Sequence, residues 1–255
     1  MDLDLRGKNA IVTGGTRGIG RAIAEQLAAE GCNVALCARG RAGIDETKAA
    51  LAGKGVRAFG GTVDVADRKA LRGWVDEAAG LLGGLDIFVA NVSALERTQA
   101  MDEESWHLGL EIDVMSTVAG VEAAIPFLEK SAAGSIVVIG SIAAIEIAGA
   151  ARPYASVKAA LAPYVKALAR NLAAKGVRAN MVSPGNIYFE GGYWNGVEQN
   201  NPDLFKLILS RNPMGRMGTA EEVATAVVFL ASPRASFITG TNLIVDGALT
   251  QRVQF

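Results

Sequence analysis

The sequence lacks the features that mark nucleic-acid-binding, metal-binding and disulfide-stabilised proteins. Its 25 lysines and arginines nearly balance 26 aspartates and glutamates, and these charges are scattered, so we expect no surface for nucleic acid or an anionic membrane. His107 is the single histidine and belongs to no cluster of metal ligands, so we expect no metal. The two cysteines, Cys32 and Cys37, fall near one expected strand and resemble the reduced core residues of a cytoplasmic protein.

Long hydrophobic runs are also absent. Residues 1–8 contain no apolar stretch of the signal-peptide kind. The most apolar long segment, 108–128, is interrupted by Glu111, Asp113 and Glu122, and we expect a core or interface helix there rather than a membrane span. Half of the 255 residues are nevertheless hydrophobic, which is enough for one domain with a large core.

Short β-branched runs alternate with longer helical patterns. The expected strands are 9–13, 33–37, 56–63, 86–90, 134–140, 177–183 and 242–245. The expected helices are 18–30, 43–53, 67–81, 102–129, 153–175 and 220–231. This alternation predicts a doubly wound α/β Rossmann fold, with a mostly parallel seven-stranded sheet covered on both faces. Residues 184–213 lack clear periodicity and contain several glycines and prolines, so we expect a substrate-binding lid at about 186–213.

A glycine-rich turn joins the first expected strand to the first expected helix. The segment 13–20 reads Thr-Gly-Gly-Thr-Arg-Gly-Ile-Gly, which puts Gly14, Gly18 and Gly20 at this junction. There the backbone can approach a pyrophosphate closely, and free amides and the helix dipole hold its charge. Tight strand–helix packing alone is the alternative, but the position between strand and helix favours a dinucleotide site.

The end of the second expected strand indicates which dinucleotide is bound. An NAD site usually carries a carboxylate about 20 residues beyond the glycines. Residues 36–41 read Leu-Cys-Ala-Arg-Gly-Arg and contain no acid. We predict that Arg39 and Arg17 bind a 2′-phosphate and that NADPH is preferred over NADH, the alternative being two solvated surface arginines.

Tyr154 and Lys158 are four residues apart, which places them on one helix face. A nearby ammonium group favours the phenolate form of a tyrosine, as proton exchange with a carbonyl or alcohol requires. The spacing alone occurs by chance in many helices. Ser141, at the end of an expected strand, strengthens the interpretation because ligands of open α/β folds bind at that sheet edge.

Taken together, these motifs resemble those of the short-chain dehydrogenase/reductase family over essentially the whole chain, in particular 3-oxoacyl reductases and related carbonyl reductases. The matching segments are 13–20, 64–65, Asn91, Ser141, Tyr154 with Lys158, 184–185 and 240–247. The resemblance implies that Ser141 polarises the substrate oxygen and that Tyr154 is the acid/base. It also implies that Lys158 holds the nicotinamide ribose and favours the phenolate.

The resemblance further implies a set of cofactor contacts. Asp64 would contact the adenine amino group, Val65 would line the adenine pocket, and Asn91 would steady the central sheet beside the cofactor. The full set is Gly14, Thr16, Arg17, Gly18, Ile19, Gly20, Arg39, Asp64, Val65, Asn91, Tyr154, Lys158, Pro184, Gly185 and Ile187. A homotetramer, or a homodimer, is implied as well, with helices 102–129 and 153–175 at one interface and the tail 251–255 over a neighbouring subunit.

Three positions depart from the family pattern. Residues 90–93 read Ala-Asn-Val-Ser where the family usually carries Asn-Asn-Ala-Gly. Asp113 takes the place of the asparagine that completes the catalytic group, and we expect a working but altered proton relay there. Phe189 stands where a threonine usually contacts the nicotinamide carboxamide, so nicotinamide fixation is expected to differ.

The substrate is less defined by the sequence. Ser93, Tyr188, Phe189 and Trp194 are the candidate substrate contacts, and an aromatic lid suits a hydrophobic or ring-bearing carbonyl compound. Arg97 and Arg152 are candidate partners for an anionic group, although exposed surface positions are the favoured explanation for both. A β-ketoacyl thioester, a steroid-like ketone and a small sugar-derived ketone all remain open.

Two other functional classes share part of this pattern. One is a non-catalytic NADP-binding interaction protein, but that function would not explain the presence of Ser141, Tyr154 and Lys158. A different Rossmann-like enzyme, such as a methyltransferase, needs no tyrosine–lysine pair. The sequence therefore predicts an NADPH-dependent oxidoreductase that transfers a hydride between the nicotinamide and a carbonyl or secondary alcohol.

Overall fold

A single seven-stranded sheet organises the chain. The computed structural model describes residues 2–147 and 153–253. The strands are β1 (Asn9–Thr13), β2 (Asn33–Ala38), β3 (Ala58–Thr62), β4 (Ile87–Ala90), β5 (Ser135–Ile139), β6 (Arg178–Pro184) and β7 (Asn242–Val245). Their order across the sheet is β3-β2-β1-β4-β5-β6-β7, and every neighbouring pair is parallel. The predicted doubly wound α/β fold is confirmed.

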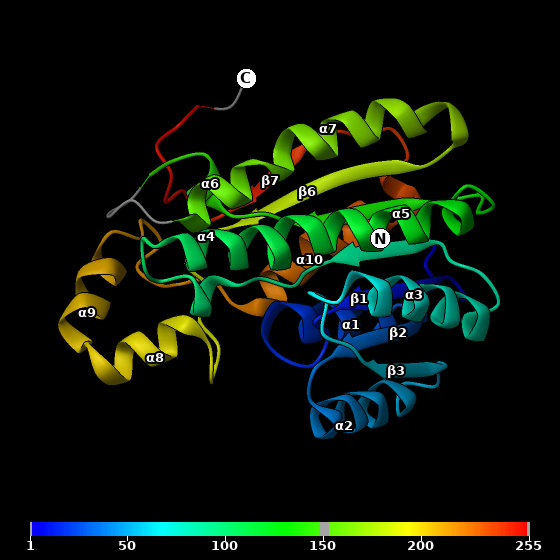
Figure 1. Ribbon diagram of the computed structural model, residues 1–255, viewed down its shortest axis with the longest axis horizontal. Coiled ribbons are helices and arrows are strands. Elements are labelled where there is room, and N and C mark those ends of the chain that lie inside the picture. The colour runs from blue at the N-terminus through cyan, green and yellow to red at the C-terminus, as the bar shows by residue number, and fades with distance from the viewer. Residues whose placement is uncertain (1, 148–152, 254–255) are drawn as a thin grey trace.

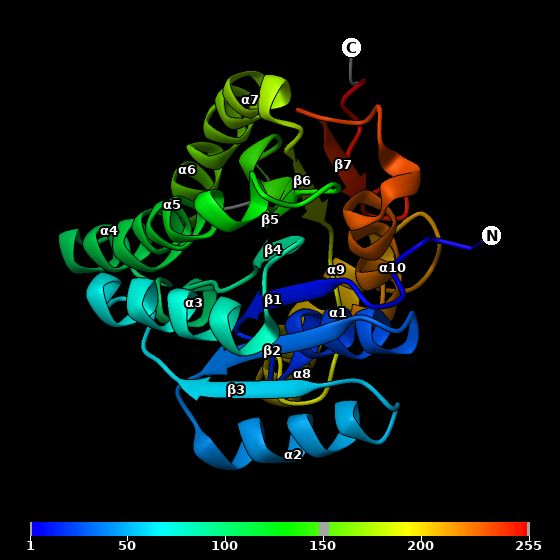
Figure 2. The same ribbon diagram turned by 90° about the vertical axis from the view of Figure 1, so that its right-hand side faces the viewer.

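Helices cover both faces of this sheet (Figures 1 and 2). One face is covered by α1 (Gly18–Ala29), α2 (Arg41–Ala52) and α10 (Ala220–Ala231). The other face is covered by α3 (Arg68–Leu82), α5 (Ser116–Leu128) and α7 (Leu161–Leu172), and the short helix α6 (Pro153–Ala159) leads into α7. Because both faces are covered, the central strands are buried along nearly their whole length, whereas the edge strands β3 and β7 are only partly buried.

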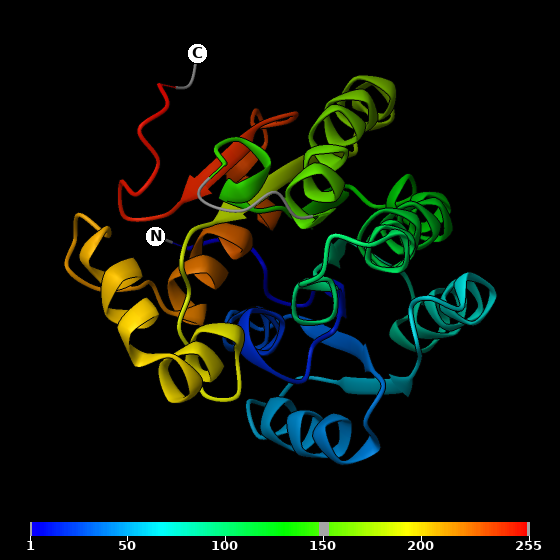
Figure 3. The same cartoon turned by 60° about the vertical axis from the view of Figure 1, so that its left-hand side comes forward.

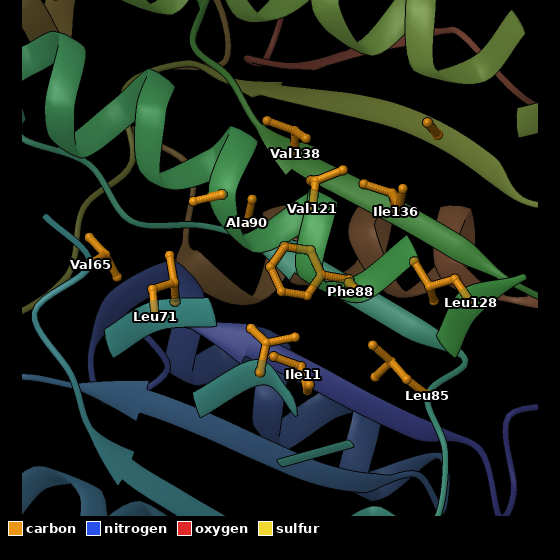
Figure 4. Close-up of a cluster of buried hydrophobic side chains, with 14 of the residues drawn as sticks. Ile11, Val65, Leu71, Leu85, Phe88, Ala90, Val121, Leu128, Ile136 and Val138 are labelled. Atoms are coloured by element: carbon orange, nitrogen blue, oxygen red, sulfur yellow. The ribbon is translucent and has the colours of Figure 1, made fainter. Parts of the chain in front are cut away.

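Phe88 of β4 is the largest fully buried side chain of the core on the α3 and α5 face (Figure 4). Gly120 of α5 makes room for its ring, since a Cβ at that position would lie 2.6 Å from Phe88 Cζ. Val121 and Ile136 lie around the same ring. The close approach of α5 to β4 thus depends on one small residue in an otherwise apolar helix.

The expected helix 102–129 is divided. It consists of α4 (Glu103–Gly109), a π-helical segment Leu110–Met115 and α5. A π-helical turn is wider than an α-helical one and is frequent at functional sites. The segment Leu110–Met115 contains Asp113, one of the residues that depart from the family pattern.

The prediction of an irregular segment at 184–213 is wrong in part. Two helices, α8 (Tyr193–Asn200) and α9 (Pro202–Ser210), occupy it. Asn201 caps α9 by accepting a hydrogen bond from the Leu204 amide at 3.1 Å, and Pro202 takes the first helical position. These two signals were present in the sequence. Figure 3 shows this pair, in yellow and orange, at one edge of the molecule.

Both cysteines are buried and unpaired. Burial raises the pKa of Cys32 and of Cys37 to about 12. Since the thiolate is the reactive form, we expect neither thiol to be alkylated by iodoacetamide in the folded protein at pH 8. Both should be alkylated once the chain is denatured, and mass spectrometry of the two samples checks this. Labelling of the folded chain would contradict the burial.

Candidate active site

The carboxyl ends of β1, β4, β5 and β6 meet at one edge of the sheet. Strand order reverses between β1 and β4, and a crevice at such a reversal is where open α/β sheets bind ligands. A cavity of about 810 Å³ lies at this edge. Residues expected from the sequence that line it are Gly14, Thr16, Arg17, Ile19, Gly20, Arg39, Asp64, Val65, Asn91, Ser93, Ser141, Tyr154, Lys158, Pro184, Gly185, Ile187, Phe189 and Trp194.

Three expected site residues do not line the cavity. Gly18 is covered by the ring of Phe189, as a Cβ on Gly18 would lie 2.5 Å from Phe189 Cζ. Asp113 lies behind Lys158. Tyr188 turns toward α8, where its hydroxyl donates to Glu198 and accepts from the Asn195 amide. This placement does not fit the expected substrate contact by Tyr188. Arg152 and residues 254–255 of the tail lie outside the described residues.

The glycine turn fits a dinucleotide pyrophosphate. Gly14 and Gly18 have φ angles of +66° and +50°, which favour glycine. A Cβ at Gly20 would lie 2.2 Å from the Gly14 carbonyl oxygen, so only glycine allows α1 to begin this close to the turn. Among the described residues no side chain caps the start of α1, and its first turn has no acid. Its amides and dipole are therefore open to a phosphate.

Asn91 braces this turn from the neighbouring strand. Its side-chain amide donates to the Thr13 and Gly14 carbonyl oxygens at 3.1 and 3.2 Å. Its backbone N–H donates to Thr13 Oγ1 at 3.0 Å. One asparagine thus ties the end of β4 to the end of β1. These bonds agree with the steadying role that the family resemblance implies for Asn91.

The two arginines near the turn have different surroundings. Arg17 forms an ion pair with Glu96 at 2.9 Å and donates to the Gly191 carbonyl oxygen at 3.2 Å. Arg39 lines the cavity and has no ion pair in the part of the chain that the structure describes. Glu96 was not expected at the site. Nothing in the sequence relates a residue of the loop after β4 to one of the glycine turn.

Ser141, Tyr154 and Lys158 come together at the end of β5. Ser141 is buried, and its Oγ accepts the Ala143 N–H at 3.1 Å, a contact that does not use the hydroxyl proton. The Lys158 ammonium donates to the Ile139 carbonyl oxygen at 3.0 Å. These contacts fix two polar groups beside the half-buried Tyr154.

Lys158 forms a buried ion pair with Asp113, which does not line the cavity. Asp113 Oδ1 lies 2.8 Å from Lys158 Nζ, and both side chains are 1% exposed. Oδ1 accepts no well-aligned hydrogen bond, so the contact is an ion pair. Burial by itself lowers the pKa of Lys158, but the charges of Asp113 and Tyr154 more than offset it, and the pKa lies above its ordinary value. The lysine therefore carries its positive charge at neutral pH.

Helix α9 supplies an apolar wall that was missed in the sequence. Leu204, Leu207 and Ile208 line the cavity, at the spacing of one helical face. Arg97 and Arg211 line it as well. Among the described residues there is no group of three or more histidines, cysteines or acids that could hold a metal, and no helix that could cross a membrane.

The fold and this cavity define a dinucleotide-binding protein of the doubly wound α/β class. A family model described as enoyl-(acyl carrier protein) reductase matches residues 14–250. The chain belongs to the family of short-chain dehydrogenases/reductases, which are oxidoreductases, and the family prediction is confirmed.

Individual relatives resemble the chain over nearly its whole length. An isoepoxydon dehydrogenase of Penicillium expansum is 38% identical, with 98% of each chain covered. A short chain dehydrogenase from Burkholderia cenocepacia J2315, solved in complex with NADP, has a TM-score of 0.88 and 33% identity, covering 96% of this chain and 98% of that one. The L-sorbose reductase from Gluconobacter frateurii, solved with NADPH and L-sorbose, has a TM-score of 0.88 and 30% identity, covering 99% and 100%.

Proposed function

We propose that this chain is an NADPH-dependent oxidoreductase that interconverts a carbonyl compound and a secondary alcohol, with Tyr154 as the acid/base. The observation that carries the proposal is that Ser141, Tyr154 and Lys158 line the same cavity as the glycine turn. A dinucleotide held by that turn and by the residues around Arg39, Asp64 and Val65 would reach the three polar side chains. The NADP and NADPH complexes of the two solved relatives support this choice of cofactor.

The chain's own groups would handle the proton. A bound nicotinamide supplies the hydride for the carbonyl carbon. Ser141 would donate a hydrogen bond from its hydroxyl to the substrate oxygen and orient it, and Tyr154 would transfer its phenolic proton to that oxygen. This leaves a phenolate, which the positive charge of Lys158 stabilises until a proton returns from solvent. Oxidation of the alcohol runs the same steps in reverse.

Cofactor preference should depend mainly on Arg39. Arg39→Ala is expected to weaken NADPH binding about 10- to 100-fold and NADH binding little, because the 2′-phosphate loses a charged donor. Arg17→Ala should have a smaller effect, since Arg17 has to leave Glu96 to reach a phosphate. Titration of cofactor fluorescence measures both constants.

Arg41→Ala is the matched control. Arg41 follows Arg39 closely in sequence, but it pairs with Asp45 at 2.8 Å and does not line the cavity. Its loss should leave the ratio of NADPH to NADH affinity unchanged. Equal affinity of the unaltered chain for NADPH and NADH would overturn the proposed cofactor choice.

The apolar wall of α9 favours a hydrophobic or ring-bearing carbonyl substrate. Trp194, Phe189 and Leu207 would contact its apolar part, and Ser93 lies at the same cavity. We propose that residues 186–213 act as the lid over this substrate. A panel of ketones, β-ketoacyl thioesters and ketoses, followed by NADPH consumption, tests the class. Binding of NADPH without turnover of any member would favour the non-catalytic alternative.

We further propose a single-domain, cytoplasmic enzyme that assembles as a homotetramer. Met101, Trp106 and Leu110 are large exposed hydrophobics in or next to α4 and the π-helical segment, and burial against a second copy would remove them from water. The two unpaired cysteines agree with a reducing compartment. Sedimentation of the full chain, and of a chain shortened by its last five residues, tests the assembly and the role of the tail.

A further inference from the structure

We propose that Asp113 is a positioning residue whose carboxylate is the buried counter-ion of Lys158, so that this site requires an acid where its family carries asparagine. The inference concerns the same site as the proposed function and rests on it for the effect on turnover. The ion pair itself stands on the structure alone.

The two carboxylate oxygens of Asp113 contact different groups. Oδ1 lies 2.8 Å from Lys158 Nζ, and Oδ2 accepts the backbone N–H of Ala94 at 3.0 Å. One partner is a cation and the other is an N–H donor, so both positions favour an oxygen atom over an NH₂ group. An asparagine has only one oxygen. Its NH₂ group would face either the ammonium or the Ala94 amide, donor against donor.

The position of Lys158 depends on this arrangement. Its ammonium is held between Asp113, from the π-helical segment, and the Ile139 carbonyl oxygen, at the end of β5. Ala94 lies in the loop after β4, from which Ser93 and Leu95 line the cavity. Asp113 therefore joins the lysine to a wall of the cavity, and its loss would disturb both.

The positive charge of Lys158 is buried, and groups next to it determine its pKa. The charged or titratable groups that act on Lys158 are Asp113 and, from its own helix α6, Tyr154. A buried ammonium without its counter-ion is strongly unfavourable and gives up its proton more readily. Removing the carboxylate charge should thus lower the pH at which Lys158 becomes neutral. With the carboxylate present, the lysine stays charged well above neutral pH.

A stability cycle tests the ion pair without any substrate. In the unaltered chain, Asp113→Asn should lower the thermal unfolding midpoint by about 10 °C. In a Lys158→Met chain the same change should raise the midpoint, because there Asp113 is itself an unpaired buried charge. Glu122→Gln is the control, since Glu122 pairs with Arg72 on the exposed side of α5 and should shift the midpoint little in either background.

Turnover tests the positioning role. With NADPH and a substrate found in the carbonyl panel, Asp113→Asn should lower kcat about 10- to 100-fold and move the alkaline limb of its pH profile to lower pH. Glu122→Gln should leave the profile in place.

Three results would overturn the proposal. One is an equal loss of stability from Asp113→Asn in both backgrounds. Another is a double variant that is no more stable than the Lys158→Met chain. The third is an unchanged pH profile. If no carbonyl compound is reduced, the proposed function fails, while the stability cycle still decides whether Asp113 is the counter-ion of Lys158.

Discussion

Replacing Tyr154 with phenylalanine should reduce kcat by about 10²- to 10⁴-fold while NADPH binding is retained. The change removes one oxygen from a half-buried side chain at the cavity and leaves Ser141, the glycine turn and Arg39 in place. The substrate oxygen would then lack its proton donor. Initial rates of NADPH consumption and fluorescence titration with NADPH measure the two effects separately.

Tyr164→Phe is a matched control for this change. Tyr164 belongs to α7, packs against the core and does not line the cavity. Burial raises the pKa of its hydroxyl to about 12, so it does not ionise at working pH. This variant should turn over normally. Activity within tenfold of the unaltered enzyme in Tyr154→Phe would show that another group supplies the proton.

Gly20→Ala should abolish cofactor binding and destabilise the fold by about 1–3 kcal/mol. The added Cβ would lie 2.2 Å from the Gly14 carbonyl oxygen and 2.4 Å from Asn91 Nδ2. The first contact is with backbone, which cannot swing aside as a flexible side chain can. The turn must therefore shift, and the bonds from Asn91 that brace it are disturbed.

The same substitution at Gly73 provides the comparison. Gly73 lies on the exposed side of α3, and a Cβ there would meet nothing within 4 Å. Alanine is the better helix former by about 0.8–1 kcal/mol, so Gly73→Ala should stabilise the chain. Denaturant unfolding and NADPH titration of the two variants distinguish the effects. Normal NADPH affinity in Gly20→Ala would disprove the importance of this close contact.

The sequence was most informative where burial is continuous. Strands such as 135–139 and 178–184 are buried at every residue, which is why apolar runs predicted the parallel sheet and its carboxyl edge. The edge strand 58–62 is only partly buried, and its predicted span of 56–63 was too long. Ser141, Tyr154, Lys158 and the glycine turn were predicted to share a site, and in the structure these three side chains and most of the turn line one cavity.

Contacts between distant segments could not be predicted from local patterns. The spacing of Tyr154 and Lys158 indicates a shared helix face, but only the folded chain brings Asp113 within 2.8 Å of the lysine. The ion pair of Arg17 with Glu96 and the packing of Phe189 on Gly18 are of the same kind. The composition of the segment also does not tell which aromatic side chains turn away from the cavity, as Tyr188 does.

The strand order also affects how the chain folds. In the centre of the sheet, Ala10 of β1 pairs with Val34 on one side and with Ile87 on the other. During synthesis, β1 and β2 can meet early, but the second edge of β1 stays unpaired until β4 has left the ribosome. Pairing between such distant segments is slow, and an open strand edge invites association with other chains. We therefore expect the half-synthesised chain, with this strand edge open, to be more prone to aggregate than the folded protein.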